Sequence, residues 1–202
     1  FAGSSEMFGD VSISPQSEST PFNPRSVYGI SKLAAFHLAR NYRAQHKMFV
    51  TVGILYNHES PRRGFEFVTR KITSSVAKIH LGVADSLELG NIDAQRDWGY
   101  APDYVEAMHA MLQMEVPDDF VVATGALHTV KDFLRVAFSV VGLRYEDYVR
   151  INPEYYRPGE LVPLCGDSSK IKNMVNWRVS KTFDEVIKEM VLKDIELLGR
   201  KP

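Results

Sequence analysis

Apolar residues follow two kinds of pattern along the chain. Helical spacing predicts helices over Arg25–His46, Phe65–Leu81, Tyr104–Gln113, Val130–Val141 and Phe183–Leu198. Near-continuous apolar runs predict buried strands at the first residues, over Met48–Tyr56 and over Phe120–Thr124, with a short strand over Ser86–Leu89. Residues 9–25 are rich in Ser, Pro and Asn and predict an irregular loop. Strands that alternate with helices indicate an α/β fold with a parallel sheet.

The first predicted helix combines a core-facing stripe with a polar pair. The stripe consists of Ile30, Leu33, Ala34 and Leu38. Tyr28 and Lys32 lie four residues apart, so they share a face one turn apart, and that face lies off the stripe. A lysine ammonium near a phenol favours the ionised phenol, which can act as a base. A solvated surface pair is the alternative interpretation.

A second polar pair lies where the first strand ends. Ser4 and Glu6 are two residues apart, so on an extended segment they project to the same side. Ligands of α/β sheets bind beyond the carboxyl ends of the strands, where a hydroxyl and a carboxylate would meet them. Ordinary loop polarity explains the same residues, and the pattern alone leaves both readings open.

Composition narrows the class of protein. Of the 202 residues, 45% are hydrophobic, which excludes a disordered tail. The 24 basic and 25 acidic residues give a net charge of −1, so the chain as a whole has no positive field that would attract nucleic acid. The uncharged runs are far shorter than the ~18 apolar residues that a membrane span needs. The one cysteine, Cys165, predicts no internal disulfide and a reducing, cytoplasmic location. The six histidines show no metal-site spacing, so no metal is expected.

Several motifs together carry a family resemblance. Tyr28-Gly-Ile-Ser-Lys32, placed 24 residues after Ser4, resembles the extended short-chain dehydrogenase/reductase enzymes that act on nucleotide sugars. Longer stretches resemble the GDP-mannose 4,6-dehydratase family, in the right order and over almost the whole chain: Ser4–Gly9, Pro24–Lys32, Asn57–Gly64, Phe67–Ile72, Gly90–Gly99, Tyr104–Met108 and Tyr156–Pro158.

The resemblance implies a role for individual residues. The implied catalytic residues are Ser4, Glu6, Tyr28 and Lys32. The residues implied to contact the cofactor, NADP, are Tyr28, Lys32, His58 and Arg63. Those implied to hold the GDP-sugar are Asn57, Val68, Lys71, Arg96 and Arg157. Guanidinium groups bind diphosphates bidentately, which suits the arginines. The alternatives are a solvated face for Arg62, Arg70 and Lys71, and a structural contact for Arg157.

The implied activity is that of a hydro-lyase. It would convert GDP-mannose to GDP-4-keto-6-deoxymannose, with NADP carrying a hydride internally. One alternative is a 4-ketoreductase, an epimerase or another dehydratase of the same superfamily, and a second is a non-catalytic sugar-nucleotide-binding fragment. Glu6 argues against a simple epimerase, which has no C5 proton to remove. Ser5 stands where dTDP- and UDP-glucose dehydratases are expected to have Asp.

The glycine-rich dinucleotide fingerprint of the family does not occur in this chain. We therefore expect a C-terminal part of a longer enzyme that is inactive alone. The fold expected is the later part of a doubly wound, Rossmann-type parallel sheet with a smaller discontinuous substrate domain. Residues 1–56 would belong to the NADP-binding domain and 57–202 mostly to the nucleotide-sugar domain, with segments near 98–124 returning to the first. Similar enzymes imply a homodimer or homotetramer.

Overall fold

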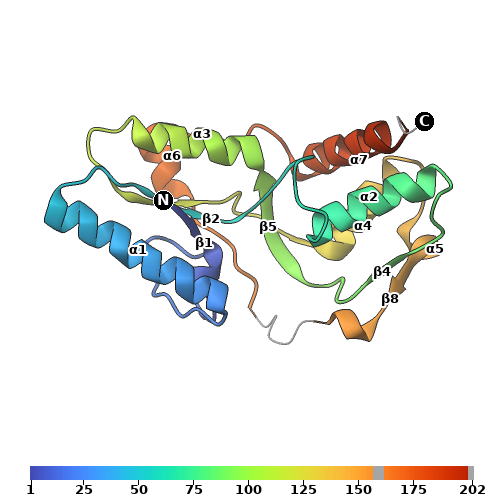
Figure 1. Ribbon diagram of the computed structural model, residues 1–202, viewed down its shortest axis with the longest axis horizontal. Coiled ribbons are helices and arrows are strands. Elements are labelled where there is room, and N and C mark those ends of the chain that lie inside the picture. The colour runs from blue at the N-terminus through green and yellow to red at the C-terminus, as the bar shows by residue number, and fades with distance from the viewer. Residues whose placement is uncertain (157–161, 200–202) are drawn as a thin grey trace. The chain divides into compact units, whose positions relative to one another are not determined.

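The predicted parallel sheet is present, and its strands come from three separate parts of the chain. The computed structural model describes residues 1–156 and 162–199. Three strands, β1 (Ala2–Ser4), β2 (Val52–Leu55) and β6 (Asp119–Val122), pair in the order β1-β2-β6, and both ladders are parallel. All residues of β2 and β6 are buried, as expected for strands that are covered on both faces. The α/β fold class predicted from the sequence is confirmed (Figure 1).

The chain divides into two compact units. Unit 1 consists of Phe1–His58, Arg96–Leu127 and Leu161–Ser180. Unit 2 consists of Glu59–Gln95, His128–Glu160 and Lys181–Pro202. A further three-stranded sheet, with the order β3-β5-β7, is formed by β3 (Asn57–Glu59), β5 (Gln95–Tyr100) and β7 (Leu127–Thr129). Each unit is discontinuous in sequence, since it consists of three separate segments.

Helices cover the parallel sheet of unit 1. The 20-residue α1 (Val27–His46) packs on β1 and on the 3-10 helix η1 (Ser5–Met7). The helix α3 (Ala101–Leu112) contacts β2 and α6 (Ser169–Val175), and α6 also packs on β6. The buried core between them includes Phe8, Ile54, Tyr104, Met111 and Phe120.

The buried face of α1 differs from the predicted stripe. Ile30 and Leu38 are 54% and 60% exposed, whereas Gly29 and Phe36 are the buried residues of the helix. The inward face is fixed by a close approach: a Cβ on Gly29 would lie 2.5 Å from the carbonyl oxygen of Glu6. Leu33 of the predicted stripe packs against the core, but the inward face is centred on Gly29 and Phe36, because only glycine lets η1 rest on the helix backbone. Apolar character alone therefore placed the face only in part.

Unit 2 has a helical core. The helices α2 (Val68–His80), α4 (Val130–Ser139) and α7 (Phe183–Gly199) pack against one another (Figure 1). A parallel ladder of β4 (Leu87–Leu89) and β8 (Val149–Ile151) accompanies them, with the short helices α5 (Tyr145–Tyr148) and η2 (Pro153–Tyr155). The capping box of Thr129 and Asp132 sets the start of α4. In the described part of the chain, no helix is long and apolar enough to cross a membrane.

Two elements differ from those predicted. No strand was predicted between Leu89 and Tyr104, where the six-residue strand β5 lies. The helix predicted from Tyr104 is α3, which already starts at Ala101 with Pro102 in its first turn. Asp103 is buried, and its carboxylate accepts hydrogen bonds from the backbone N–H and the hydroxyl of Ser180. A tertiary partner, which the local pattern does not reveal, satisfies this carboxylate.

Candidate functional site

Several predicted site residues gather at one edge of the parallel sheet in unit 1. Ser4 is the last residue of β1 and pairs in register with Leu55, the last residue of β2. Asn57 and His58 follow two and three residues later. The carboxyl ends of parallel strands meet at the same edge, where α/β folds bind ligands. This edge is therefore the candidate active site.

The sequence analysis expected an extended segment from Ser4 to Glu6, and the structure differs. The chain turns into η1 directly after β1, and the buried Ser4 hydroxyl caps this turn by accepting the backbone N–H of Glu6 at 3.2 Å. The Glu6 side chain is exposed. The 3-10 turn, not strand alternation, therefore sets the position of Glu6 relative to Ser4.

The start of α1 lies beside the same segment. The ammonium group of Lys32 donates a hydrogen bond to the carbonyl of Ala2 at 3.0 Å, and Gly29 contacts the backbone of Glu6. The helix therefore begins at the carboxyl end of β1, and Tyr28 stands at that end. The Lys32 ammonium lies 5.7 Å from the centroid of the Tyr28 ring, and the ring is 53% exposed. Ser4, Glu6 and the start of α1 with Tyr28 are thus neighbours in unit 1, whereas the Lys32 ammonium reaches back to the first residue of β1.

His58 is oriented by its neighbours in unit 1. Its Nδ1 lies 2.8 Å from the carbonyl oxygen of Tyr56. Because a carbonyl can only accept, Nδ1 carries the proton that is donated. The ring also stacks on Tyr104, with centroids 4.8 Å apart and an interplanar angle of 26°. Both contacts fix the plane of the imidazole at the sheet edge.

Arg96 lies on β5 next to a carboxylate that the sequence analysis missed. The buried Asp97 accepts hydrogen bonds from the backbone N–H and hydroxyl of Thr124, at 2.9 and 2.6 Å. It also accepts the N–H groups of Gly125 and Gly166. Since β6 ends at Val122, this carboxylate fixes β5, and with it the half-buried Arg96, near the carboxyl end of β6.

Three other predicted residues belong to unit 2. Val68 begins α2 and is 37% exposed. The Lys71 ammonium donates to the carbonyl of Glu88 at 2.7 Å and lies 4.5 Å from the ring centroid of Tyr155. Arg63 lies in the loop between β3 and α2 and stacks on the ring of Phe67. Arg157 lies outside the described residues.

Arg70 is not part of a solvated face, which corrects one alternative of the sequence analysis. Its side chain is 4% exposed and forms an ion pair with the equally buried Asp194 of α7 at 2.6 Å. The Thr73 hydroxyl donates to the same carboxylate at 2.7 Å. These contacts anchor α2 to α7, so the structural role of Arg70 is to join two helices of unit 2.

Glu59 is a second buried carboxylate that the sequence analysis did not single out. It ends β3, is 2% exposed, and accepts the Thr69 hydroxyl at 2.6 Å. The Arg63 Nε lies 3.3 Å from the same carboxylate oxygen. Burial raises the pKa of Glu59 to about 7, although Arg63 and Thr69 act in the opposite direction. The only sequence signal was its place within the Asn57–Gly64 motif.

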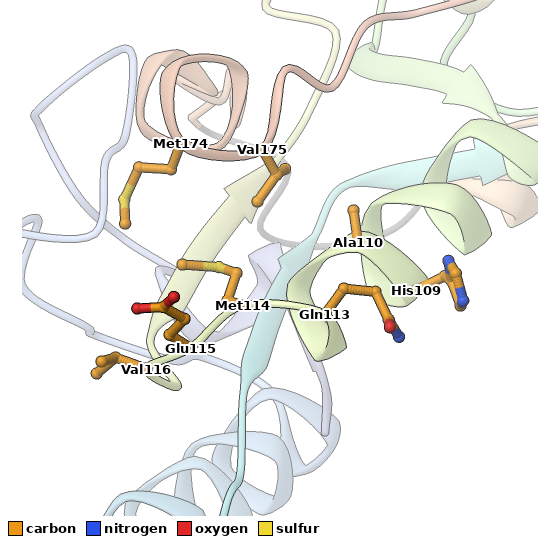
Figure 2. A pocket seen from close by; sticks show the side chains of 8 residues that line it. All are labelled: His109, Ala110, Gln113, Met114, Glu115, Val116, Met174 and Val175. Atoms are coloured by element: carbon orange, nitrogen blue, oxygen red, sulfur yellow. The ribbon is translucent and has the colours of Figure 1, made fainter.

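A groove in unit 1 lies away from Ser4 and the carboxyl ends of the parallel strands. It is lined by the end of α3, the following loop and the end of α6, and Figure 2 shows Met114, Val116, Met174 and Val175 around it. The loop leads into the amino end of β6, which is opposite to the edge at which Ser4 lies. The groove therefore contributes no predicted site residue. Within residues 1–156 and 162–199, no cluster of three or more His, Cys, Asp or Glu side chains is placed to hold a metal ion.

A family model and individual relatives match the same enzyme family. The family model described as GDP-mannose 4,6 dehydratase matches residues 1–190. GDP-mannose 4,6 dehydratase 1 of Arabidopsis thaliana is 54% identical over 98% of this chain, and the alignment covers 55% of that protein. GDP-mannose 4,6 dehydratase of Homo sapiens is 46% identical over 100% of this chain and 59% of its own length. The chain thus spans little more than half the length of these curated relatives.

Solved structures resemble the fold at lower sequence identity. RMD from Pseudomonas aeruginosa complexed with NADPH aligns with a TM-score of 0.87 and 20% identity, over 96% of this chain and 65% of that chain. DesIV, a dTDP-glucose 4,6-dehydratase from Streptomyces venezuelae with NAD and TYD bound, aligns with a TM-score of 0.85 and 20% identity, over 98% and 60%. At this identity the likeness establishes the fold, which agrees with the predicted Rossmann-type architecture.

Proposed function

The chain belongs to the GDP-mannose 4,6-dehydratase family, and we propose that the whole protein removes water from GDP-mannose to give GDP-4-keto-6-deoxymannose. The observation that carries this proposal is that Ser4 and Glu6, at the carboxyl end of β1, lie beside the start of α1, which carries Tyr28 and Lys32. A hydroxyl, a carboxylate, a phenol and an ammonium on these neighbouring elements supply the groups that an oxidation followed by an elimination requires.

The proposed cofactor is NADP. The residues of this chain suit it, because the Lys32 ammonium and the Tyr28 phenol share one helix face, and the Arg63 guanidinium offers a planar set of donors for a phosphate. His58 is the fourth residue of the proposed cofactor contacts. When bound, NADP accepts a hydride from C4 of the sugar and returns it to C6. The NADPH complex of the structurally similar RMD supports this choice.

The side chains of unit 1 move the protons. Tyr28, as phenolate, takes the proton of the 4-hydroxyl group, and the Lys32 ammonium lies on the same helix face. The Ser4 hydroxyl donates a hydrogen bond to the oxygen at C4. Once C4 is a ketone, the C5 proton is acidic, and the Glu6 carboxylate removes it while the C6 hydroxyl leaves as water. The sugar gains a 4-keto group and loses one water, so no net oxidation occurs.

Further proposals concern the substrate and the assembly. Asn57, Val68, Lys71, Arg96 and Arg157 would hold the GDP-sugar. Residues 1–56 and the segments near 98–124 would serve the cofactor, and most of 57–202 the nucleotide sugar. We also place the protein in the cytoplasm as a homodimer or homotetramer, which cell fractionation and light scattering of the whole protein check.

Substrate choice tests the proposed activity. The whole protein is supplied with NADP and either GDP-mannose or dTDP-glucose, and formation of the 4-keto-6-deoxy product is measured. We expect turnover of GDP-mannose alone. Equal or faster turnover of dTDP-glucose would assign the protein to another dehydratase of the superfamily.

A Glu6→Gln variant separates a dehydratase from a reductase or epimerase. The amide keeps the size of the side chain but removes the base, so the 4-keto-6-deoxy product and the incorporation of solvent deuterium at C5 should both be lost. Binding of GDP-mannose should remain. Product formation near the parent rate would show that another group removes the C5 proton.

A further inference from the structure

We infer that Glu59 is a positioning residue that holds the Arg63 guanidinium in place for the anionic cofactor. The inference rests on the proposed function, in which Arg63 contacts NADP. Glu59 itself is nearly inaccessible, so it has no direct access to a ligand. Any effect that it has on cofactor binding must pass through a neighbour.

Two contacts hold the Arg63 side chain. The Glu59 carboxylate lies 3.3 Å from its Nε, and its guanidinium carbon lies 3.6 Å from the centroid of the Phe67 ring. The Nε is buried and makes no hydrogen bond to any described residue, so the nearby carboxylate compensates its charge. The side chain still has 26% of its surface exposed. The carboxylate and the ring thus fix the inner part of the guanidinium, while its outer part can meet a phosphate.

Glu59 is in turn fixed by α2. The Thr69 hydroxyl donates to the same Oε2 atom that faces Arg63, at 2.6 Å. Thr69 is 1% exposed and lies in the first turn of α2, so it is a rigid donor. The contacts that orient Arg63 therefore run from α2 through Thr69 and Glu59, and all of these residues belong to unit 2.

Arg70 holds the backbone of the same loop but has a different task. Its Nη1 donates to the carbonyl oxygens of Pro61 and Arg63, and its remaining donors are bound by Asp194. With its donors used in this way, Arg70 is a structural cation. Arg63, which keeps an exposed part, is the cation of this loop that is suited to a ligand.

The ionised form of Glu59 is the form that attracts Arg63. The charged group that pairs with it is Arg63 from the loop. Arg70 of α2 binds the backbone carbonyl of Arg63, and its own charge is compensated by Asp194 of α7. Burial raises the pKa of Glu59 to about 7. Protonation near neutral pH therefore weakens the hold on Arg63, and the contribution of Glu59 to cofactor binding should increase as the pH rises through 7.

A mutant cycle in the whole protein tests the inference. The dissociation constant for NADP is measured for the parent, Glu59→Gln, Arg63→Ala and the double variant. The introduced amide can still accept the Thr69 hydrogen bond but carries no charge. We expect Glu59→Gln to weaken NADP binding about tenfold at pH 8.5, as for the loss of one charge-assisted contact, and to leave kcat at saturating NADP within about twofold. In the Arg63→Ala background the same change should have no further effect.

The pH dependence supplies a readout that a purely structural role would not change. Protonated Glu59 and glutamine are both neutral, so the ratio of the two dissociation constants should be near one at pH 5.5 and reach its full value at pH 8.5. Using the ratio removes the titration of NADP itself. The matched control is Glu66→Gln, which makes the same change at an exposed position of the same loop and should leave NADP binding unchanged.

Three results would overturn the inference. They are an unchanged dissociation constant in Glu59→Gln, an equal loss in the Arg63→Ala background, and a ratio that is the same at pH 5.5 and 8.5. If Arg63→Ala weakens NADP binding while Glu59→Gln does not, only the positioning role is lost and the proposed cofactor contact stands. If neither weakens binding, both are wrong.

Discussion

Two segments carry most of the proposed functional residues, and they differ in how far their polar and charged side chains are exposed to solvent. Where β1 meets α1, Glu6 and Tyr28 have exposed side chains. Between β3 and the first turns of α2, Glu59 and Arg70 are almost inaccessible, and each faces a charged partner. Exposed groups are available for chemistry on a substrate, whereas the buried charges shape the loop that carries Arg63.

The energetic consequences differ accordingly. Removing an exposed side chain costs little folding energy, whereas removing one member of a buried ion pair leaves an uncompensated charge. Substitutions at the first segment should therefore affect activity with little effect on stability. Substitutions at the second should affect stability, and the following experiments test this division.

Tyr28→Phe should have the largest effect, and only on catalysis. Loss of the phenol removes the base for the 4-hydroxyl proton, and a positioned base contributes about 10²- to 10⁴-fold to a rate. Because the ring is 53% exposed, the unfolding free energy should change by no more than about 0.5 kcal/mol. Turnover of GDP-mannose and denaturant unfolding of the whole protein measure the two effects. A near-parent rate would remove Tyr28 from the mechanism.

Asp194→Ala should have the next largest effect, and on stability. It leaves the Arg70 guanidinium buried without its carboxylate, which costs about 3–5 kcal/mol of unfolding free energy. The control on the same helix is Glu196→Ala, which breaks an exposed pair with Lys193 and should cost no more than about 1 kcal/mol. Equal losses in the two variants, measured by denaturant unfolding, would contradict the distinction between buried and exposed pairs.

The pH dependence of stability gives an effect of similar or smaller size. The pKa of Glu59 is raised to about 7 in the folded protein, so the folded state holds this proton more tightly than the unfolded state. The resulting stabilisation is full below about pH 4.5 and is lost as the pH rises through 7. Relative to Glu59→Gln, the parent should therefore lose unfolding free energy over this range, by about 1.4 kcal/mol for each unit by which the pKa is raised.

Comparing the two proteins at each pH removes the contributions of the carboxylates whose pKa is lowered, such as Asp132, since both proteins contain them. A difference that stays constant between pH 4.5 and 8 would show that Glu59 is already ionised at low pH. Such a result would also remove the basis for the pH dependence of cofactor binding.

Local sequence patterns predicted the elements that local contacts define. The start of α1 agrees to within two residues, because the Ser26 hydroxyl caps it by accepting the N–H of Gly29. The strand predicted over Met48–Tyr56 shortens to β2, because its neighbours β1 and β6 have only three and four residues. Met48 and Phe49 are apolar but exposed. Strand length is thus set by the partner strands.

At the candidate site too, local patterns predicted only what depends on residues that are close in sequence. The spacing of Tyr28 and Lys32 is local and was recognised in the sequence. The role of Asp97 depends on Gly166, which is 69 residues away, and that of Arg70 on a carboxylate 124 residues away. No periodicity records such partners. The inward face of α1 was predicted only in part for a related reason, since it depends on the approach of η1 to Gly29.

The distance along the chain between Arg70 and Asp194 has a consequence for synthesis. A ribosome adds about 5–20 residues each second. Because Asp194 follows Arg70 by 124 residues, α2 is synthesised several seconds before Asp194 is added. During that interval the Arg70 guanidinium has no Asp194 carboxylate with which to pair. The ion pair that anchors α2 to α7 therefore forms only after α7 has been synthesised, and the helical core of unit 2 is completed only then.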